Sequence, residues 1–186
     1  VPVHLVNEGG QHRKPEYRAL NPQMLVPTLE KDGLTIGQSM AILEWLDETY
    51  PEPSFLPGTA DERARIRAFA DIIACDIHPL QNLRVLQYLR AEYGQDQAGT
   101  DTWCQRWIGD GLAACEVLLQ KRQKPAEFCF GDTPGLADIC LVPQVFSAQR
   151  FGVDLTDMPL VRAVHEACEA LPAFADAHPS KQPDAA

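Results

Sequence analysis

Two short stretches in the first quarter of the chain carry groups that can bind an anionic, peptide-like ligand. Gln38-Ser39 opens an apolar helical pattern, so we expect Ser39 to cap a helix whose first N–H groups attract a carboxylate. Val26-Pro27 begins an extended stretch, and a cis bond at this proline would leave the Val26 backbone free to pair with a peptide as an added strand does. Simpler interpretations stay open: a serine that only caps its helix, and an ordinary proline on an edge strand.

The overall charge argues against nucleic acid as a partner. The 186 residues carry a formal net charge of −10, whereas duplex binding needs clustered lysines and arginines. The one run of basic residues, Arg63, Arg65 and Arg67, follows Asp61-Glu62 and is typical of a solvated helix start. Any bound anion therefore needs a local cation or a helix N-terminus.

Cysteine and histidine spacing supports neither a disulfide framework nor a metal site. The six cysteines form no C-x-x-C pair, and most lie in apolar helical patterns, as free thiols do in a reducing compartment. The five histidines show no metal-ligand spacing, so we expect no metal. No apolar run reaches membrane-spanning length and there is no signal-peptide pattern, so we expect a cytoplasmic protein with no membrane partner.

The first part of the chain mixes strand and helix patterns. Asp32-Gly33 separates two extended stretches and supplies the positive φ values of a two-residue hairpin turn. Pro51, Pro53 and Pro57 cannot continue a helix and indicate a linker between a first domain, 1–52, and a second, 58–186. The expected elements of the first domain are a short strand at 1–5, a helix at 14–20, hairpin strands at 25–30 and 34–36, and a helix at 40–50.

The residues after the linker are helical in pattern throughout. Pro79 removes a backbone donor, so the helical pattern from Asp61 to Tyr93 should kink or break there. A last helix is expected from Pro159 to Leu171. One stripe at helical spacing is expected to lie in the core: Trp103, Trp107, Gly111, Cys115 and Leu118.

A helix buried on every side is expected at Leu136–Phe146, because this stretch is apolar almost all round. Asp138 is the exception within it. We expect this carboxylate to accept backbone N–H groups at the helix start, with Gly135 as the cap residue.

The order of these motifs closely resembles the zeta class of the glutathione transferases, which contains the maleylacetoacetate isomerases and the closely related maleylpyruvate isomerases. The resemblance covers nearly the whole chain and is strongest at 21–28, Gln38-Ser39, 76–84 and 135–144. It implies an α/β plus all-α fold, in which a thioredoxin-like N-terminal lobe is followed by a glutathione transferase-type helical domain. It also implies a homodimer.

The resemblance further implies that glutathione is the cofactor. Val26 would pair through its main chain with the cysteinyl part of glutathione, while Gln38 and Ser39 hold the γ-glutamyl end. By itself, His78 is more typical of an ordinary histidine on a helix surface. The further glutathione contacts that the resemblance implies come from His12, His78, Asn82, Leu83 and Arg84.

The chemistry implied by the family is a cis-trans isomerisation of maleylacetoacetate, a cis-diketo acid, to fumarylacetoacetate. A thiol adds to the conjugated double bond, the resulting single bond rotates, and elimination returns the thiol. Arg150 is expected to bind a substrate carboxylate; alternatively, it only complements the dipole at the end of its helix. Other functions stay open: isomerisation of maleylpyruvate, general glutathione transfer, and a non-catalytic binding module.

No residue of this sequence matches the Ser- and Cys-containing motif with which the family lowers the thiol pKa of glutathione. We therefore expect no catalytic residue among these 186 residues. The motif is expected in a first β-α unit of about 30 residues that is absent from this sequence and precedes Val1.

Overall fold

The computed structural model describes residues 1–6 and 9–182 and divides into two compact units. The first comprises Val1–Ser54 together with the C-terminal residues from Ala177, and the second comprises Phe55–Asp176.

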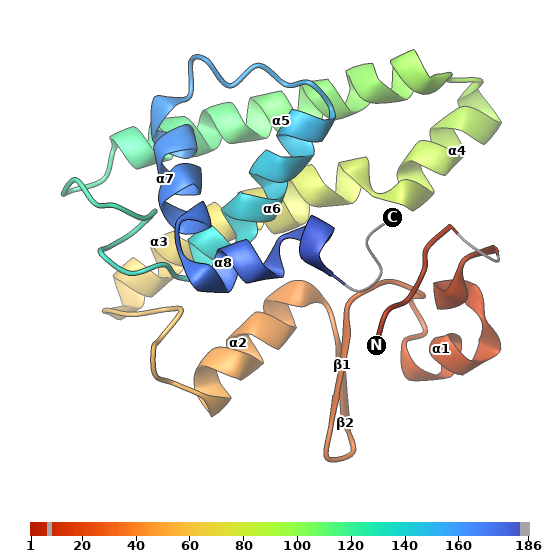
Figure 1. The fold of residues 1–186 in the computed structure, drawn as a ribbon, viewed down its shortest axis with the longest axis horizontal. Coiled ribbons are helices and arrows are strands. Elements are labelled where there is room, and N and C mark those ends of the chain that lie inside the picture. The colour runs from red at the N-terminus through yellow and green to blue at the C-terminus, as the bar shows by residue number, and fades with distance from the viewer. Residues whose placement is uncertain (7–8, 183–186) are drawn as a thin grey trace. The chain divides into compact units, whose positions relative to one another are not determined.

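The first unit contains a two-stranded antiparallel sheet, β1 (Thr28–Lys31) and β2 (Leu34–Gly37), as Figure 1 shows. Lys31 pairs with Leu34, so the turn holds only Asp32 at φ 50° and Gly33 at φ 83°. Two successive positive φ values match the right-handed twist of the strands. The predicted hairpin is confirmed, although its first strand begins at Thr28 rather than at residue 25.

Helices precede and follow this hairpin. A single 3-10 turn at Gln11–Arg13 leads into α1 (Pro15–Leu20), and α2 (Ser39–Thr49) follows β2 directly. The strand predicted at 1–5 was wrong. Both backbone groups of His4 bond to Gln11 instead, its N–H to the side-chain Oε1 at 3.0 Å and its carbonyl to the backbone N–H at 2.7 Å. These two groups are therefore not available to a strand partner.

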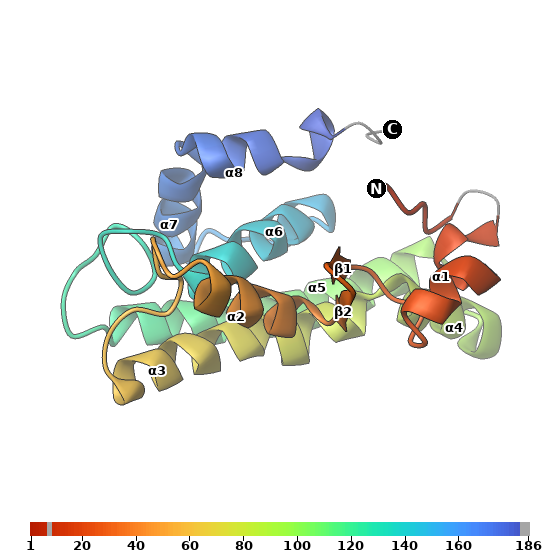
Figure 2. The same ribbon diagram turned by 90° about the horizontal axis from the view of Figure 1, so that it is seen from below.

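The second unit is entirely helical in the ranges that the structure describes. Figure 2 shows the run from α3 (Ala60–Asp71) to α4 (Leu83–Tyr93), which lies alongside the long helix α5 (Gln97–Gln120). Helix α6 (Leu136–Arg150) packs against α3, α5 and α7 (Pro159–Glu169), and the short helix α8 (Pro172–Ala177) follows. The helix predicted from Pro159 is confirmed as α7, but it was wrongly expected to be the last helix, since α8 follows it.

Among residues 1–6 and 9–182, the fully buried apolar side chains all belong to the second unit. On α5 they occupy one row at helical spacing, Cys104, Ile108, Leu112, Cys115 and Leu119. The predicted core stripe was therefore partly wrong, since Trp107 and Leu118 are each 38% exposed. The row that contains Trp107 and the neighbouring row that contains Ile108 both follow the helical period. Because α6 and α7 pack against α5, the Ile108 row is the one that is buried.

The helical pattern between Asp61 and Tyr93 breaks, as Pro79 predicts. The α-helical geometry ends at Asp71 and gives way to a π-helical segment, Ile72–Ile77, and then to η4, a 3-10 turn at His78–Gln81. Asn82 restarts the helix, because its side chain accepts a hydrogen bond from the Arg84 backbone N–H at 3.1 Å.

The start of α6 depends on Asp138, as predicted. Its Oδ2 accepts a hydrogen bond from the Gly135 N–H and its Oδ1 accepts one from the Cys129 N–H, both at 2.8 Å. The Leu136 N–H donates to the carbonyl of Phe55 at 2.9 Å. Asp138 is only 2% exposed, so no solvent could replace its bonds if the carboxylate were lost.

Replacing Asp138 with Ala should lower the free energy of unfolding by about 3 kcal/mol or more, because two backbone N–H groups lose their acceptor inside the protein. Urea unfolding followed by circular dichroism measures this. Asp154→Ala is the matched control, since Asp154 also accepts a backbone N–H, from Thr156 at 2.9 Å, but is exposed. Equal losses in the two variants would contradict the structural role assigned to Asp138.

Candidate functional site

Polar contacts fix the loop before β1 but leave the backbone groups of one residue, Val26, without a hydrogen-bond partner among the described residues. The Tyr17 hydroxyl donates to the Leu25 carbonyl at 2.6 Å, and Asn21 Nδ2 donates to the same carbonyl at 2.8 Å. Asn21 also bonds to Thr28 Oγ1 at 3.1 Å, which ties the two ends of the loop together. Between these anchors, Val26 is 40% exposed, and its backbone N–H and C=O have no partner among the described residues. The Val26-Pro27 bond is cis.

The N-terminus of α2 differs from the prediction in its cap. Gln38 occupies the cap position with φ 72°, and Ser39 is the first residue of the helix, so the expectation that Ser39 caps it was wrong. Strand β2 continues to Gly37, and Gln38 alone turns the chain from strand into helix. No side chain caps this end in the described structure, and both Gln38 and Ser39 are exposed.

Hairpin register brings these two features to the same end of the sheet. Thr28 pairs with Gly37, so Val26 lies just before the paired residues of β1, and Gln38 lies just after those of β2. The Gln38 side chain also donates to Gln23 Oε1 at 2.7 Å, which links it to the loop that carries Val26. Open backbone groups and an uncapped helix start are thus adjacent, as a ligand with both a peptide bond and a carboxylate requires.

His12 was also predicted to contact glutathione, but unlike Val26, Gln38 and Ser39 its side chain is buried. Its side chain lies so close to Gly10 that a Cβ there would approach the ring at 2.6 Å. Burial, with a smaller contribution from Arg13, lowers the pKa of His12 below its usual value. The ring is therefore neutral at neutral pH.

In the second unit, the predicted residues lie where the long helix breaks. His78 begins the 3-10 turn, Asn82 caps α4, and Leu83 and Arg84 form the first turn of that helix. Partial burial lowers the pKa of His78, and solvent at the exposed part of the ring limits the effect. Arg84 is exposed, so its guanidinium can reach an anion.

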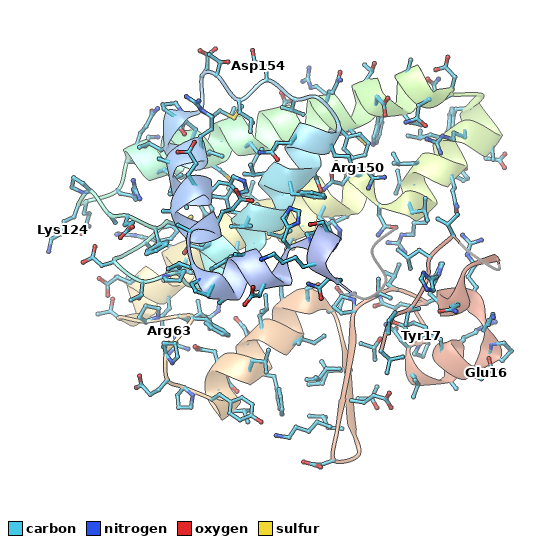
Figure 3. All side chains as sticks on the ribbon, viewed as in Figure 1. Glu16, Tyr17, Arg63, Lys124, Arg150 and Asp154 are labelled. Carbon is cyan, nitrogen blue, oxygen red and sulfur yellow. The ribbon has the colours of Figure 1, made fainter. Side chains whose placement is uncertain are left out.

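Arg150 is the last residue of α6, as Figure 3 shows. Its guanidinium carbon lies 5.7 Å from the centroid of the Phe151 ring, and Gln105 Nε2 bonds to the Phe151 carbonyl at 2.8 Å. No carboxylate of the described residues forms an ion pair with Arg150, which leaves this cation available to a ligand.

None of the six cysteines is suited to act as a nucleophile. None forms a disulfide in the described structure, and burial raises the pKa of Cys104 to about 11 and those of Cys115, Cys140 and Cys168 to about 12. The pKa of Cys129 and that of the exposed Cys75 are raised as well, so these thiols are protonated at neutral pH. Across residues 1–6 and 9–182, no group of three side chains is placed to hold a metal ion. No helix described there is long and apolar enough to cross a membrane.

Three comparisons with known proteins identify the family. A family model described as the N-terminal domain of glutathione S-transferase matches residues 1–54. The maleylacetoacetate isomerase of Pseudomonas aeruginosa is 48% identical over 99% of this chain and 85% of its own length. This chain belongs to the zeta class of the glutathione transferases.

Solved structures of relatives support the same family assignment. A holo structure of maleylpyruvate isomerase, described as a bacterial glutathione transferase of the zeta class, superposes with a TM-score of 0.93 at 53% identity, over 95% of this chain and 83% of that one. The maleylacetoacetate isomerase of Methylobacterium extorquens, solved with bound malonate and glutathione, has a TM-score of 0.90 at 36% identity, over 96% and 84% of the two chains. The predicted fold class, a thioredoxin-like lobe followed by the helical domain of a glutathione transferase, is confirmed.

The family resemblance did not point to Tyr17, which anchors the Val26 loop, nor to Gln38 as the cap of α2. A tyrosine in a short polar helix and a glutamine before a serine carry no specific signal in a single sequence. A distinct signal for Asn21 did exist, because asparagine before proline is typical of a side chain that bonds the local backbone.

Proposed function

We propose that this protein is a glutathione-dependent cis-trans isomerase that converts maleylacetoacetate to fumarylacetoacetate. The observation that carries the proposal is the uncapped N-terminus of α2 beside the open backbone of Val26, in a chain of the zeta class. A general glutathione transferase would use the same binding groups. The isomerase is favoured because the relatives compared above are isomerases of two closely similar cis-diketo acids.

Glutathione fits the groups that the first unit leaves open. The N–H and C=O of Val26 can each bond to the cysteinyl residue of a peptide ligand, as two adjacent strands do. The first N–H groups of α2 and the Ser39 hydroxyl can hold the γ-glutamyl carboxylate, with the helix dipole favouring its negative charge. Gln38, already held by Gln23, can bond to the same end of the ligand.

We assign further glutathione contacts to residues of the second unit, and one to His12 of the first. With its pKa lowered, His78 is neutral at neutral pH, so it would act as a hydrogen-bonding group rather than as a cation. Arg84 would supply the positive charge. The residues proposed for these contacts are His12, His78, Asn82, Leu83 and Arg84.

When bound, glutathione supplies a thiol that adds to the conjugated double bond of the substrate and leaves again after rotation. The role of this chain is to orient both molecules and to hold the negative charges of the substrate. In a chain with a net charge of −10, a dicarboxylate needs a local cation, and Arg150 has no internal carboxylate partner in the described structure. Malonate, bound with glutathione in the Methylobacterium extorquens enzyme, is itself a dicarboxylate.

Maleylpyruvate is a second candidate substrate, because one of the solved relatives, at 53% identity, is a maleylpyruvate isomerase. The two acids differ in the acyl tail and need the same chemistry. Turnover of each acid by the full-length natural protein, with glutathione in catalytic amount, decides between them. We expect the higher kcat/KM with maleylacetoacetate. Glutathione binding without turnover of either acid would instead indicate a non-catalytic binding module.

Replacing Arg150 with Ala should raise KM for the diacid about tenfold or more, the scale of one lost charge-assisted hydrogen bond. Arg63→Ala is the control, because it removes the same charge from the start of α3 (Figure 3), a helix that carries none of the proposed binding residues. Steady-state kinetics measure both. Unchanged kinetics in the Arg150 variant would leave this arginine with only a dipole-complementing role at the end of α6.

We also propose that the protein is a cytoplasmic homodimer. Six cysteines, none of them in a disulfide in the described structure, are consistent with a reducing compartment, and the family resemblance supports pairing of two copies. Size-exclusion chromatography with light scattering at micromolar concentration should give twice the mass of one chain. A monomer mass would contradict the proposal.

A further inference from the structure

Two glutamines from separate sequence motifs meet inside the helical unit. Gln81 lies in the 76–84 motif and Gln144 lies in the 135–144 motif, and neither is among the proposed binding residues. Gln81 Nε2 donates to Gln144 Oε1 at 2.7 Å, across 63 positions of sequence. This bond joins the last residue of the 3-10 turn η4 to the middle of α6.

The free energy of folding gives no reason for two amide side chains at these positions. Gln144 is 2% exposed. Gln144 Nε2 and Gln81 Oε1 are buried and have no hydrogen-bond partner among the described residues, so each amide uses only part of its bonding capacity. Replacing both partners of such a pair with apolar groups of the same shape is often neutral or stabilising. The pair is thus better explained by what it holds in place.

The Gln81–Gln144 hydrogen bond holds a segment whose helical geometry is irregular. A π-helical stretch and a 3-10 turn precede Asn82, and such stretches have poorer internal hydrogen bonding than an α-helix and are frequent at functional sites. The segment is anchored from outside at two neighbouring residues. Trp103 Nε1 on α5 donates to the Leu80 carbonyl at 2.7 Å, and Gln144 on α6 bonds to Gln81.

We propose that Gln81 and Gln144 are positioning residues. Their bond holds the segment from His78 to Arg84 against α6. Because Arg150 follows Gln144 on the same helix, the bond also sets the distance between this segment and Arg150. The proposal rests on the function proposed above, since it connects the glutathione contacts of the helical unit to the arginine that binds the substrate.

The double variant Q81M/Q144M tests the proposal, because it replaces both amides with unbranched apolar side chains of similar length. We expect a thermal unfolding midpoint close to that of the wild type. Hydrogen exchange of the 78–84 backbone amides should become faster, with the other helices unchanged. The Kd for glutathione, measured by isothermal titration calorimetry, and KM for the diacid should each rise about tenfold, the scale of losing an outer contact that orients binding groups.

Gln123→Met is the matched control, because Gln123 is exposed in the loop after α5 and should change none of these quantities. Unchanged exchange at 78–84 in the double variant would overturn the proposal, as would faster exchange spread over all the helices, which indicates a purely structural role. Faster local exchange in a protein whose wild type turns over neither acid would support the positioning role while refuting the isomerase function. A wild-type Kd and KM alongside faster local exchange would overturn the link to binding.

Discussion

The hydrogen bonds of one buried carboxylate determine how the helical unit is built. Asp138 accepts the N–H groups of Cys129 and Gly135, so the loop that enters α6 and the first turn of α6 are fixed by one side chain. Helix α6 in turn packs against α3, α5 and α7. Glu116 acts similarly for α7, since its Oε2 accepts the N–H groups of Leu160 and Val161 at 2.9 Å each. Buried helix starts need such acceptors because their first N–H groups have no partner within the helix.

The same property explains where the proposed binding groups lie. Within a helix or a paired strand, the backbone N–H and C=O groups are hydrogen-bonded to each other. They lack such partners only where an element begins, ends or breaks. Val26 precedes β1, Gln38 and Ser39 begin α2, and Asn82 restarts a broken helix. In an acidic chain, we propose these ends, together with Arg84 and Arg150, as the source of the local positive potential that a negatively charged tripeptide and a diacid require.

Several features could be read from sequence because they depend on neighbouring residues alone. Asp32-Gly33 specifies the hairpin turn, Pro79 prevents a continuous helix, and a carboxylate at the third position of α6 suits the start of that helix. Other predictions failed where the decision lay outside the local sequence. Ser39 is a good cap residue, yet the strand before it continues to Gly37 and moves the cap to Gln38. Residues 1–5 have a strand-like composition, yet Gln11 bonds both backbone groups of His4.

The sequence by itself determined the family, through its resemblance at 21–28, Gln38-Ser39, 76–84 and 135–144. It also determined the hairpin turn and the break in the helical pattern near Pro79, because turn and proline effects act within a few positions of the chain. Only the tertiary structure decided which row of α5 is buried, since the Trp107 row and the Ile108 row have the same period and differ only in what packs against them. It alone brought Gln81 to Gln144, because a contact across 63 positions depends on the packing of two helices and leaves no periodic signal in the sequence.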